Sequence, residues 1–283
     1  MNKLGGFVRL MRPVNCAMMG FAVFVGALLA VSTALAANWL NLVFGFFTGF
    51  LLCAAAMTIN DYYDRGIDAV NEPARPIPSG LIGANTALAF VSVLTVVGLV
   101  FAVFSSVLCL AVAAASWVIT VSYVTVGKRS GLPGNFLVST CVAIPFIYGS
   151  IAITGGLQLN VLLFALMAFL SNTGREITKG IVDVKGDSAE GVKTLAVRYG
   201  EKKASVAAAV FYISAVALTP LTWLLGLVGV WFVPFVLVTD VGLVVCSAVL
   251  LLDPSREKAR RVKKVVLLLF LVGLLAYIFG VFR

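Results

Sequence analysis

Nine long apolar stretches separated by short polar loops constrain what this chain can fold into. Each is close to the roughly 20 residues that a helix needs to cross the hydrocarbon core of a bilayer. The stretches cover residues 14–36, 39–62, 83–105, 107–126, 135–154, 159–183, 203–225, 228–252 and 264–282. With 61% hydrophobic and 12% charged residues, the chain is also more apolar than a water-soluble domain. We therefore predict an all-α polytopic membrane protein with nine transmembrane helices, in which residues 1–283 form one domain.

The positions of the basic residues indicate which helix ends face the cytoplasm. With nine spans, all of the 21 Lys and Arg residues except Arg283 lie in the N-terminal segment and in alternate loops. Cytoplasmic loops of membrane proteins carry this excess of positive charge. We expect a multi-pass protein of the cell membrane with a cytoplasmic N-terminus and an external C-terminus. The net charge of +9 could indicate a nucleic-acid partner, but the basic residues follow the membrane topology instead. We therefore expect no nucleic-acid partner.

The side chains available for chemistry are limited. The chain has no His, and its five Cys residues stand singly within apolar runs. This excludes acid–base catalysis by His and disfavours haem, zinc and copper sites. Carboxylates remain as the natural metal ligands.

A first acidic cluster, Asn60, Asp61, Asp64 and Asp68, follows the second apolar stretch. At 100° per residue these side chains share one stripe of a helix. Acids at a helix C-terminus oppose the macrodipole, so the cluster needs water, cations or a metal to stabilise it. A merely solvated helix end is the alternative. The proline-rich loop that follows would hold Arg75 rigidly near the stripe, where it could bind a phosphate oxygen, although an ordinary turn is also compatible with this loop.

A second acidic cluster, Asp183 and Asp187, ends the sixth stretch. If the helix continues, both aspartates share a narrow stripe with Asn172, Glu176 and Lys179. Mixed charges at this spacing also occur on salt-bridged surface helices. The apolar run before the stripe and the repeated Asp-x-x-x-Asp spacing favour a binding site.

Two aspartate clusters with nearby Arg and Lys suit the binding of a diphosphate. Carboxylates hold such a group through Mg²⁺, while basic side chains bind its remaining oxygens. Mg²⁺ fits better than zinc because hard oxygen ligands dominate. A site at the mouth of a membrane helix bundle implies a substrate with a polar head and a membrane-resident tail, as in an isoprenoid diphosphate.

These residues resemble the UbiA superfamily of intramembrane prenyltransferases. The family's NDxxDxxxD motif corresponds to the first acidic cluster, and its DxxxD motif corresponds to Asp183 and Asp187. The resemblance implies nine helices around a central cavity, with Mg²⁺ and diphosphate at the cytoplasmic end. A Tyr-x-x-x-Lys feature of the family is one residue longer here, between Tyr123 and Lys128.

Three segments resemble the branch of this superfamily that makes archaeal ether lipids. They are residues 12–15, with Arg12 and Asn15, residues 75–80 and residues 174–179. The chain departs at Gly180, where members often carry an acid. The resemblance implies transfer of a geranylgeranyl group from its diphosphate to geranylgeranylglyceryl phosphate, a lipid-like acceptor, forming the second ether bond of archaeal lipids.

The resemblance also assigns roles to individual residues. Mg²⁺ would be held by Asp61, Asp64, Asp68, Asp183 and Asp187. The diphosphate would be oriented by Asn60, Arg75 and Lys179, with Tyr123 and Lys128 as further site residues. Arg12 and Asn15, at the cytoplasmic mouth of the first helix and distant in sequence from both clusters, are candidates for binding the acceptor phosphate.

Two other functions use similar residues. A prenyltransferase for an aromatic acceptor, such as hydroxybenzoate or a naphthoate, would have the same diphosphate half-site. A secondary transporter also uses intramembrane acids, but these usually lie near the bilayer midplane. Here both aspartate clusters lie at helix ends, and Asp240 alone among the aspartates falls in the middle of a predicted span, which favours the enzyme.

Overall fold

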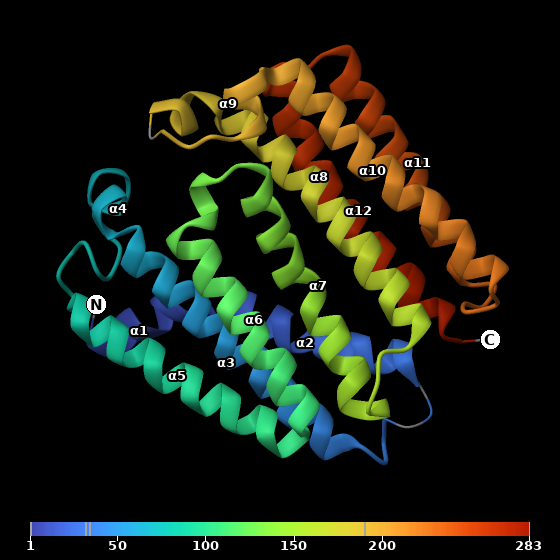
Figure 1. The fold of residues 1–283 in the computed structure, drawn as a ribbon, viewed down its shortest axis with the longest axis horizontal. Helices are drawn as coiled ribbons and strands as arrows, with labels where there is room; N and C mark the ends of the chain where they lie inside the picture. Colours follow the sequence, from blue (N-terminus) through green and yellow to red (C-terminus); the bar gives the residue numbers. More distant parts are fainter. Residues whose placement is uncertain (1, 32, 34, 190, 283) are drawn as a thin grey trace. The chain divides into compact units, whose positions relative to one another are not determined.

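The computed structural model describes residues 2–31, 33, 35–189 and 191–282, and these residues contain no strand (Figure 1). The helices are α1 (Lys3–Met11), α2 (Pro13–Ala30), α3 (Trp39–Tyr63), α4 (Arg65–Asn71), α5 (Ala84–Ser105), α6 (Val107–Thr125), η2 (Gly127–Arg129), α7 (Leu132–Thr154), α8 (Leu159–Ala189), α9 (Leu195–Tyr199), α10 (Glu201–Leu224), α11 (Phe232–Leu252) and α12 (Arg256–Gly280). The all-α prediction is therefore confirmed.

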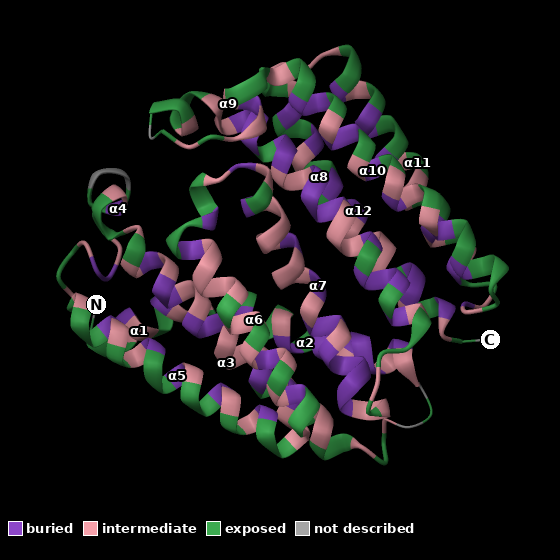
Figure 2. Cartoon of the chain, viewed as in Figure 1, coloured by how far each residue is buried: buried purple, intermediate pink, exposed green. Residues whose placement is uncertain are grey.

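Among the described residues, eight helices are long and apolar enough to cross a membrane: α2, α3, α5, α6, α7, α10, α11 and α12. The remaining predicted span, the sixth in the sequence, lies in α8. This 31-residue helix is apolar in its first part, but Asn172, Arg175 and Glu176 follow within the same helix. The exposed side of α5 carries Val96 and Val100, as expected of a surface that faces lipid (Figure 2). The protein is thus a multi-pass membrane protein.

Several helix boundaries differ from those predicted. The first span was expected to reach residue 36, but α2 ends at Ala30 and Val31 is extended. The short helix α1 was not predicted. Helix α12 begins at Arg256, eight residues before the predicted start of the span at residue 264. Ser255 caps its N-terminus, and the basic residues that follow are good helix formers. Apolar runs therefore locate a membrane core and miss helical turns outside it.

The chain forms two compact units. Unit 1 comprises Met1–Thr125 and Ile144–Leu157, and unit 2 comprises Val126–Ala143 and Gln158–Arg283. In unit 1, α3 packs against α2, α5 and α6, and in unit 2, α12 packs against α8 and α11. Helix α7 contributes residues to both units. A single domain over the whole chain stays a prediction.

In unit 1, α2 and α7 approach so closely that their contact requires glycine. A Cβ atom on Gly26 would lie 2.1 Å from the carbonyl oxygen of Phe146, and one on Gly149 would lie 2.0 Å from that of Val23. Such distances are far inside van der Waals contact. Small residues at a crossing are a common means of packing membrane helices, where no hydrophobic effect drives helix association.

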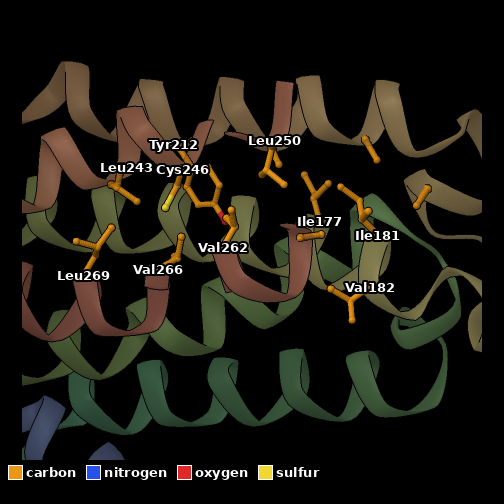
Figure 3. Packing of buried hydrophobic residues seen from close by; sticks show 14 residues of the cluster. Ile177, Ile181, Val182, Tyr212, Leu243, Cys246, Leu250, Val262, Val266 and Leu269 are labelled. Carbon is orange, nitrogen blue, oxygen red and sulfur yellow. The ribbon is translucent and has the colours of Figure 1, made fainter. Parts of the chain in front are cut away.

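The core of unit 2 fixes the orientation of α8 (Figure 3). Ile177 and Ile181 are buried against α10, α11 and α12. Tyr212 is fully buried, and its hydroxyl lies 3.0 Å from that of Thr178. At 100° per residue, the stripe that carries Glu176 and the second acidic cluster lies on the opposite side of α8 from these apolar residues. Core packing thus determines where the acidic side chains point.

A polar contact inside the membrane links α10 to α11. Pro220 removes the N–H that would bond to the carbonyl oxygen of Val216. The Thr219 hydroxyl lies 2.9 Å from that oxygen and 2.6 Å from Oδ2 of Asp240. A hydroxyl has one hydrogen and can donate to only one of the two acceptors. Oδ1 of Asp240 is buried without a partner among the described residues.

Thr219→Val is expected to lower the free energy of unfolding by about 2 kcal/mol, because the buried acceptor that the hydroxyl serves, on Val216 or on Asp240, loses its donor. Asp240→Asn should preserve stability, because its amide N–H can donate to Thr219, whose hydroxyl then serves Val216. Thermal unfolding in detergent micelles measures both effects. Thr239→Val is the control, since that hydroxyl donates to the carbonyl of Phe235 in its own helix. Equal effects of the two threonine substitutions would contradict this account.

Candidate functional site

The first acidic cluster meets a basic residue from the junction of α1 and α2. Arg12 has φ 52° and ψ 66°, and is the one non-glycine residue with positive φ among those described. This left-handed conformation costs roughly 1–2 kcal/mol. Nη2 of Arg12 lies 2.5 Å from Oδ1 of Asp61. The strained junction thus places a guanidinium on a buried carboxylate.

Asp61 and Asp68 share a second guanidinium. Nη1 of Arg75 donates to Oδ2 of Asp68 at 2.7 Å and lies 3.5 Å from Oδ1 of Asp61. Both aspartates are buried, with 4% and 6% of their surface exposed. Partial burial alone would lower the pKa of Arg75, but its bond to Asp68 and the nearby carboxylates outweigh this effect and raise that pKa above its usual value. Arg75 therefore keeps its charge.

The other two members of this cluster contact each other. Nδ2 of Asn60 donates to Oδ2 of Asp64 at 3.0 Å. Asp64 lies between α3 and α4, yet the N–H of Asp64 bonds to the carbonyl of Asn60, and that of Asp68 bonds to the carbonyl of Asp64. This i to i+4 spacing continues the helical register, so the structure places the four side chains at the spacing that the sequence predicted.

The loop that carries Arg75 is anchored on both sides. The carbonyl of Arg75 accepts the N–H of Ser79, and the carbonyl of Ala74 accepts a bond from Arg9 at 3.0 Å. Ile77 is buried in a cluster with Leu10 of α1. The predicted fixed position of Arg75 beside the acidic stripe is confirmed, and α1 contributes to it.

In unit 2, α8 carries Glu176, Lys179 and the second acidic cluster. Oε1 and Oε2 of Glu176 lie 3.3 Å from Nη1 of Arg175 and from Nζ of Lys179, respectively. Nδ2 of Asn172 donates to the buried hydroxyl of Ser139 at 3.1 Å. The predicted stripe thus exists, and within it Lys179 is bonded to Glu176.

The second acidic cluster lies near the C-terminal end of α8. Asp183 and Asp187 are both partly exposed. The carbonyl of Asp187 accepts the N–H of Val192, which turns the chain away from the helix. Nε of Arg256 donates to the carbonyl of Val182 at 2.9 Å, so the start of α12 adjoins this cluster.

The roles of all the predicted site residues stay predictions, including those of three residues that lie outside the two acidic clusters. Asn15 is exposed on α2, Tyr123 packs against a buried cluster at the end of α6, and Lys128 is exposed in η2. Tyr123 belongs to unit 1 and Lys128 to unit 2.

Sequence reasoning left several contributing residues out of the site. Glu176 was placed on the stripe but was given no role. No sequence pattern indicated the contacts of Arg9, Ser139 and Arg256. Each of these residues bonds to a residue more than 30 positions away in the sequence. Arg12 had seemed separate from the acidic residues, yet it contacts Asp61 across 49 positions of sequence.

The donor atoms of the first cluster fit Mg²⁺, which prefers carboxylate and amide oxygens. Among the described residues, no three acidic or thiol side chains are gathered closely enough to hold a metal ion. Instead, Arg12 and Arg75 compensate the charges of Asp61 and Asp68. The carboxylates and the amide of the first cluster therefore suit Mg²⁺. In this structure, the guanidinium groups of Arg12 and Arg75 balance the carboxylate charges.

Fold and site together define a multi-pass membrane protein with acidic clusters, paired with Arg and Lys, beside its apolar helices. The chain belongs to the UbiA prenyltransferase family, whose model matches residues 19–279. This confirms the predicted family and makes the protein an intramembrane prenyltransferase.

Known proteins support this assignment over the full length. Digeranylgeranylglyceryl phosphate synthase of Methanocaldococcus jannaschii is 32% identical over 283 residues, covering 100% of this chain and 98% of the relative. A solved structure concerning digeranylgeranylglyceryl phosphate synthase in membranes has TM-score 0.88 and 32% identity, covering 99% of each chain. A UbiA homolog from Archaeoglobus fulgidus, solved with GPP and Mg²⁺, shares the fold with TM-score 0.68 and 17% identity, covering 96% of this chain and 99% of its own.

Proposed function

We propose that this protein transfers a geranylgeranyl group from geranylgeranyl diphosphate to geranylgeranylglyceryl phosphate, forming the second ether bond of archaeal membrane lipids. The observation that carries the proposal is the first cluster, where Asp61 and Asp68 meet Arg12 and Arg75 at the end of a membrane-spanning helix. Such a mixed-charge site suits a diphosphate with a lipid tail. The full-length relatives that bear the name digeranylgeranylglyceryl phosphate synthase support this choice of substrates.

The carboxylates would hold the metal ion that stabilises the leaving diphosphate. Mg²⁺ held by Asp61, Asp64 and Asp68 in unit 1, and by Asp183 and Asp187 in unit 2, would supply positive charge to the departing diphosphate. The UbiA homolog solved with GPP and Mg²⁺ supports this cofactor. Asn60, Arg75 and Lys179 would donate hydrogen bonds to the diphosphate oxygens, with Tyr123 and Lys128 as further contacts.

The reaction exchanges one carbon–oxygen bond for another. The bond between the allylic carbon and the diphosphate breaks, and the diphosphate leaves with the electron pair. The acceptor hydroxyl oxygen bonds to the allylic carbon and loses its proton late, to the diphosphate or to an aspartate. Apolar helices around the reacting groups would exclude water and limit hydrolysis.

One assay tests the proposed substrates. Purified protein would receive radiolabelled geranylgeranyl diphosphate with geranylgeranylglyceryl phosphate, hydroxybenzoate or a naphthoate, each with and without Mg²⁺. We expect Mg²⁺-dependent transfer to the glyceryl phosphate. Robust transfer to an aromatic acceptor and none to the glyceryl phosphate would instead support quinone biosynthesis.

Arg12→Ala is expected to raise KM for the acceptor about tenfold or more, because a charged hydrogen bond to its phosphate is lost, while KM for the donor stays nearly constant. Steady-state kinetics with each substrate varied separately measures the two constants. Arg65→Ala is the matched control, since Arg65 is exposed and donates to the carbonyl of Tyr62 in its own turn. Equal rises in both KM values would limit the role of Arg12 to its contact with Asp61, and no change would remove it from the site.

We also propose that the N-terminus and both acidic clusters face the cytoplasm, as the distribution of Lys and Arg indicates. In a cysteine-free background, cysteines placed near Arg75, Arg129, Lys193 and Arg260 should react with an impermeant reagent from the cytoplasmic side. A cysteine near Gly156 should react from the outside. Any one of these positions labelled from the opposite side would contradict the proposed orientation.

A further inference from the structure

The first nine residues of α12 carry six basic side chains and one acid. They are Arg256, Glu257, Lys258, Arg260, Arg261, Lys263 and Lys264. The apolar part of this membrane-spanning helix begins directly afterwards, at Val265. The basic segment therefore lies at the boundary between the bilayer and water. Apart from Arg256, which contacts α8 beside the second acidic cluster, these side chains have no role in the proposed transfer reaction.

Burial shows which way this segment points. Ala259, Val262 and Val266 are 0%, 3% and 0% exposed and pack into the core of unit 2. At 100° per residue, Arg260 and Lys264 lie on the opposite side of the helix. Both are exposed, as is Arg261. We call Arg260, Arg261 and Lys264 the outer face of α12.

The protein itself compensates little of this charge. Arg261 pairs with Glu257 at 2.5 Å, and Arg256 bonds to a carbonyl of α8. Arg260 and Lys264 are like charges at i and i+4, which destabilises a helix. Anions from outside the chain would relieve this repulsion.

We propose that the outer face of α12 binds the anionic headgroups of membrane phospholipids. A row of exposed Arg and Lys directly outside an apolar span is at the level of the lipid phosphates, and guanidiniums match phosphate oxygens in a bidentate manner. Attraction of about 1 kcal/mol for each basic residue near an anionic membrane corresponds to roughly a fivefold enrichment for each residue. The outer face gathers anionic lipid beside unit 2.

The test uses the full-length protein in phosphatidylcholine vesicles with spin-labelled phosphatidylglycerol or spin-labelled phosphatidylcholine as the probe. Electron paramagnetic resonance measures the association of each lipid with the protein. We expect the wild-type protein to prefer phosphatidylglycerol, and R260Q/K264Q to lose most of that preference, by several-fold. Added salt should weaken the preference of the wild-type protein, because ions screen exposed charges.

A matched variant separates this site from a general effect of net charge. K202Q/K203Q removes two exposed basic residues from the first turn of α10 and changes the charge equally. We expect it to retain most of the preference for phosphatidylglycerol. Equal loss in both double variants, or no loss in R260Q/K264Q, would overturn the proposal. Thermal unfolding of each variant confirms that the compared proteins are folded.

Discussion

Replacing Asp64 or Asp187 by asparagine is expected to lower kcat about a hundredfold, because each variant loses one charged ligand that stabilises the departing diphosphate, an effect of about 3 kcal/mol. Both carboxylates are partly exposed. Asparagine matches aspartate in size, so the fold should remain intact. Turnover of radiolabelled donor and thermal unfolding of the same preparation measure the two quantities separately.

Glu257→Gln provides the control for lost charge. Glu257 is an exposed acid, and its side chain pairs with Arg261. Its removal should change kcat less than twofold, in line with the small effects of surface ion pairs. If a folded Asp64→Asn or Asp187→Asn variant keeps more than half of the wild-type turnover, the two clusters do not act together on the donor.

Gly149→Ala is expected to lower the free energy of unfolding by about 3 kcal/mol, because the added methyl group would overlap the backbone of α2. Its Cβ would lie 2.0 Å from the carbonyl oxygen of Val23 and 2.6 Å from the amide nitrogen of Ala27. Backbone atoms cannot rotate away as a side chain can, so the two helices must separate. Thermal unfolding in detergent micelles measures the loss.

The matched control is Gly186→Ala in α8. Among the described residues outside its own helical turn, no atom lies within 4 Å of a Cβ built at Gly186, and its φ is not positive. Alanine is favoured over glycine inside a helix by roughly 1 kcal/mol, so this variant should be as stable as the wild-type protein or more stable. If Gly149→Ala unfolds at the same temperature as Gly186→Ala, the close contact of α2 with α7 does not limit stability.

The amino-acid sequence was enough to predict the helical membrane architecture, the family and the spacing of the first acidic cluster. Long apolar runs can satisfy their backbone bonds in lipid only as helices or closed barrels, and runs of about 20 residues identify helices. The charged residues were equally informative, since acids beside a bilayer need a partner. The spacing of Asn60, Asp61, Asp64 and Asp68 depends only on the local helical repeat, which is why that prediction matches the structure.

Where a helix extends beyond its apolar run, local contacts determine the residue at which it begins or ends. Hydropathy does not indicate these contacts. Helix α8 continues beyond its apolar part to Ala189, and α12 begins with the Ser255 cap. Helix α1 has only nine residues, too few for a membrane span. Its role becomes visible only where Leu10 packs with Ile77 and holds the Arg75 loop in place.

Tertiary structure alone decided which basic residue meets which acid. The pairing of Arg12 with Asp61 spans 49 residues and depends on a left-handed turn between two helices. The glycines at the contact of α2 with α7 were likewise indistinguishable in the sequence from other glycines of the apolar runs. The local periodicity of a helix determines which side chains share its face, but only packing between helices determines what that face contacts.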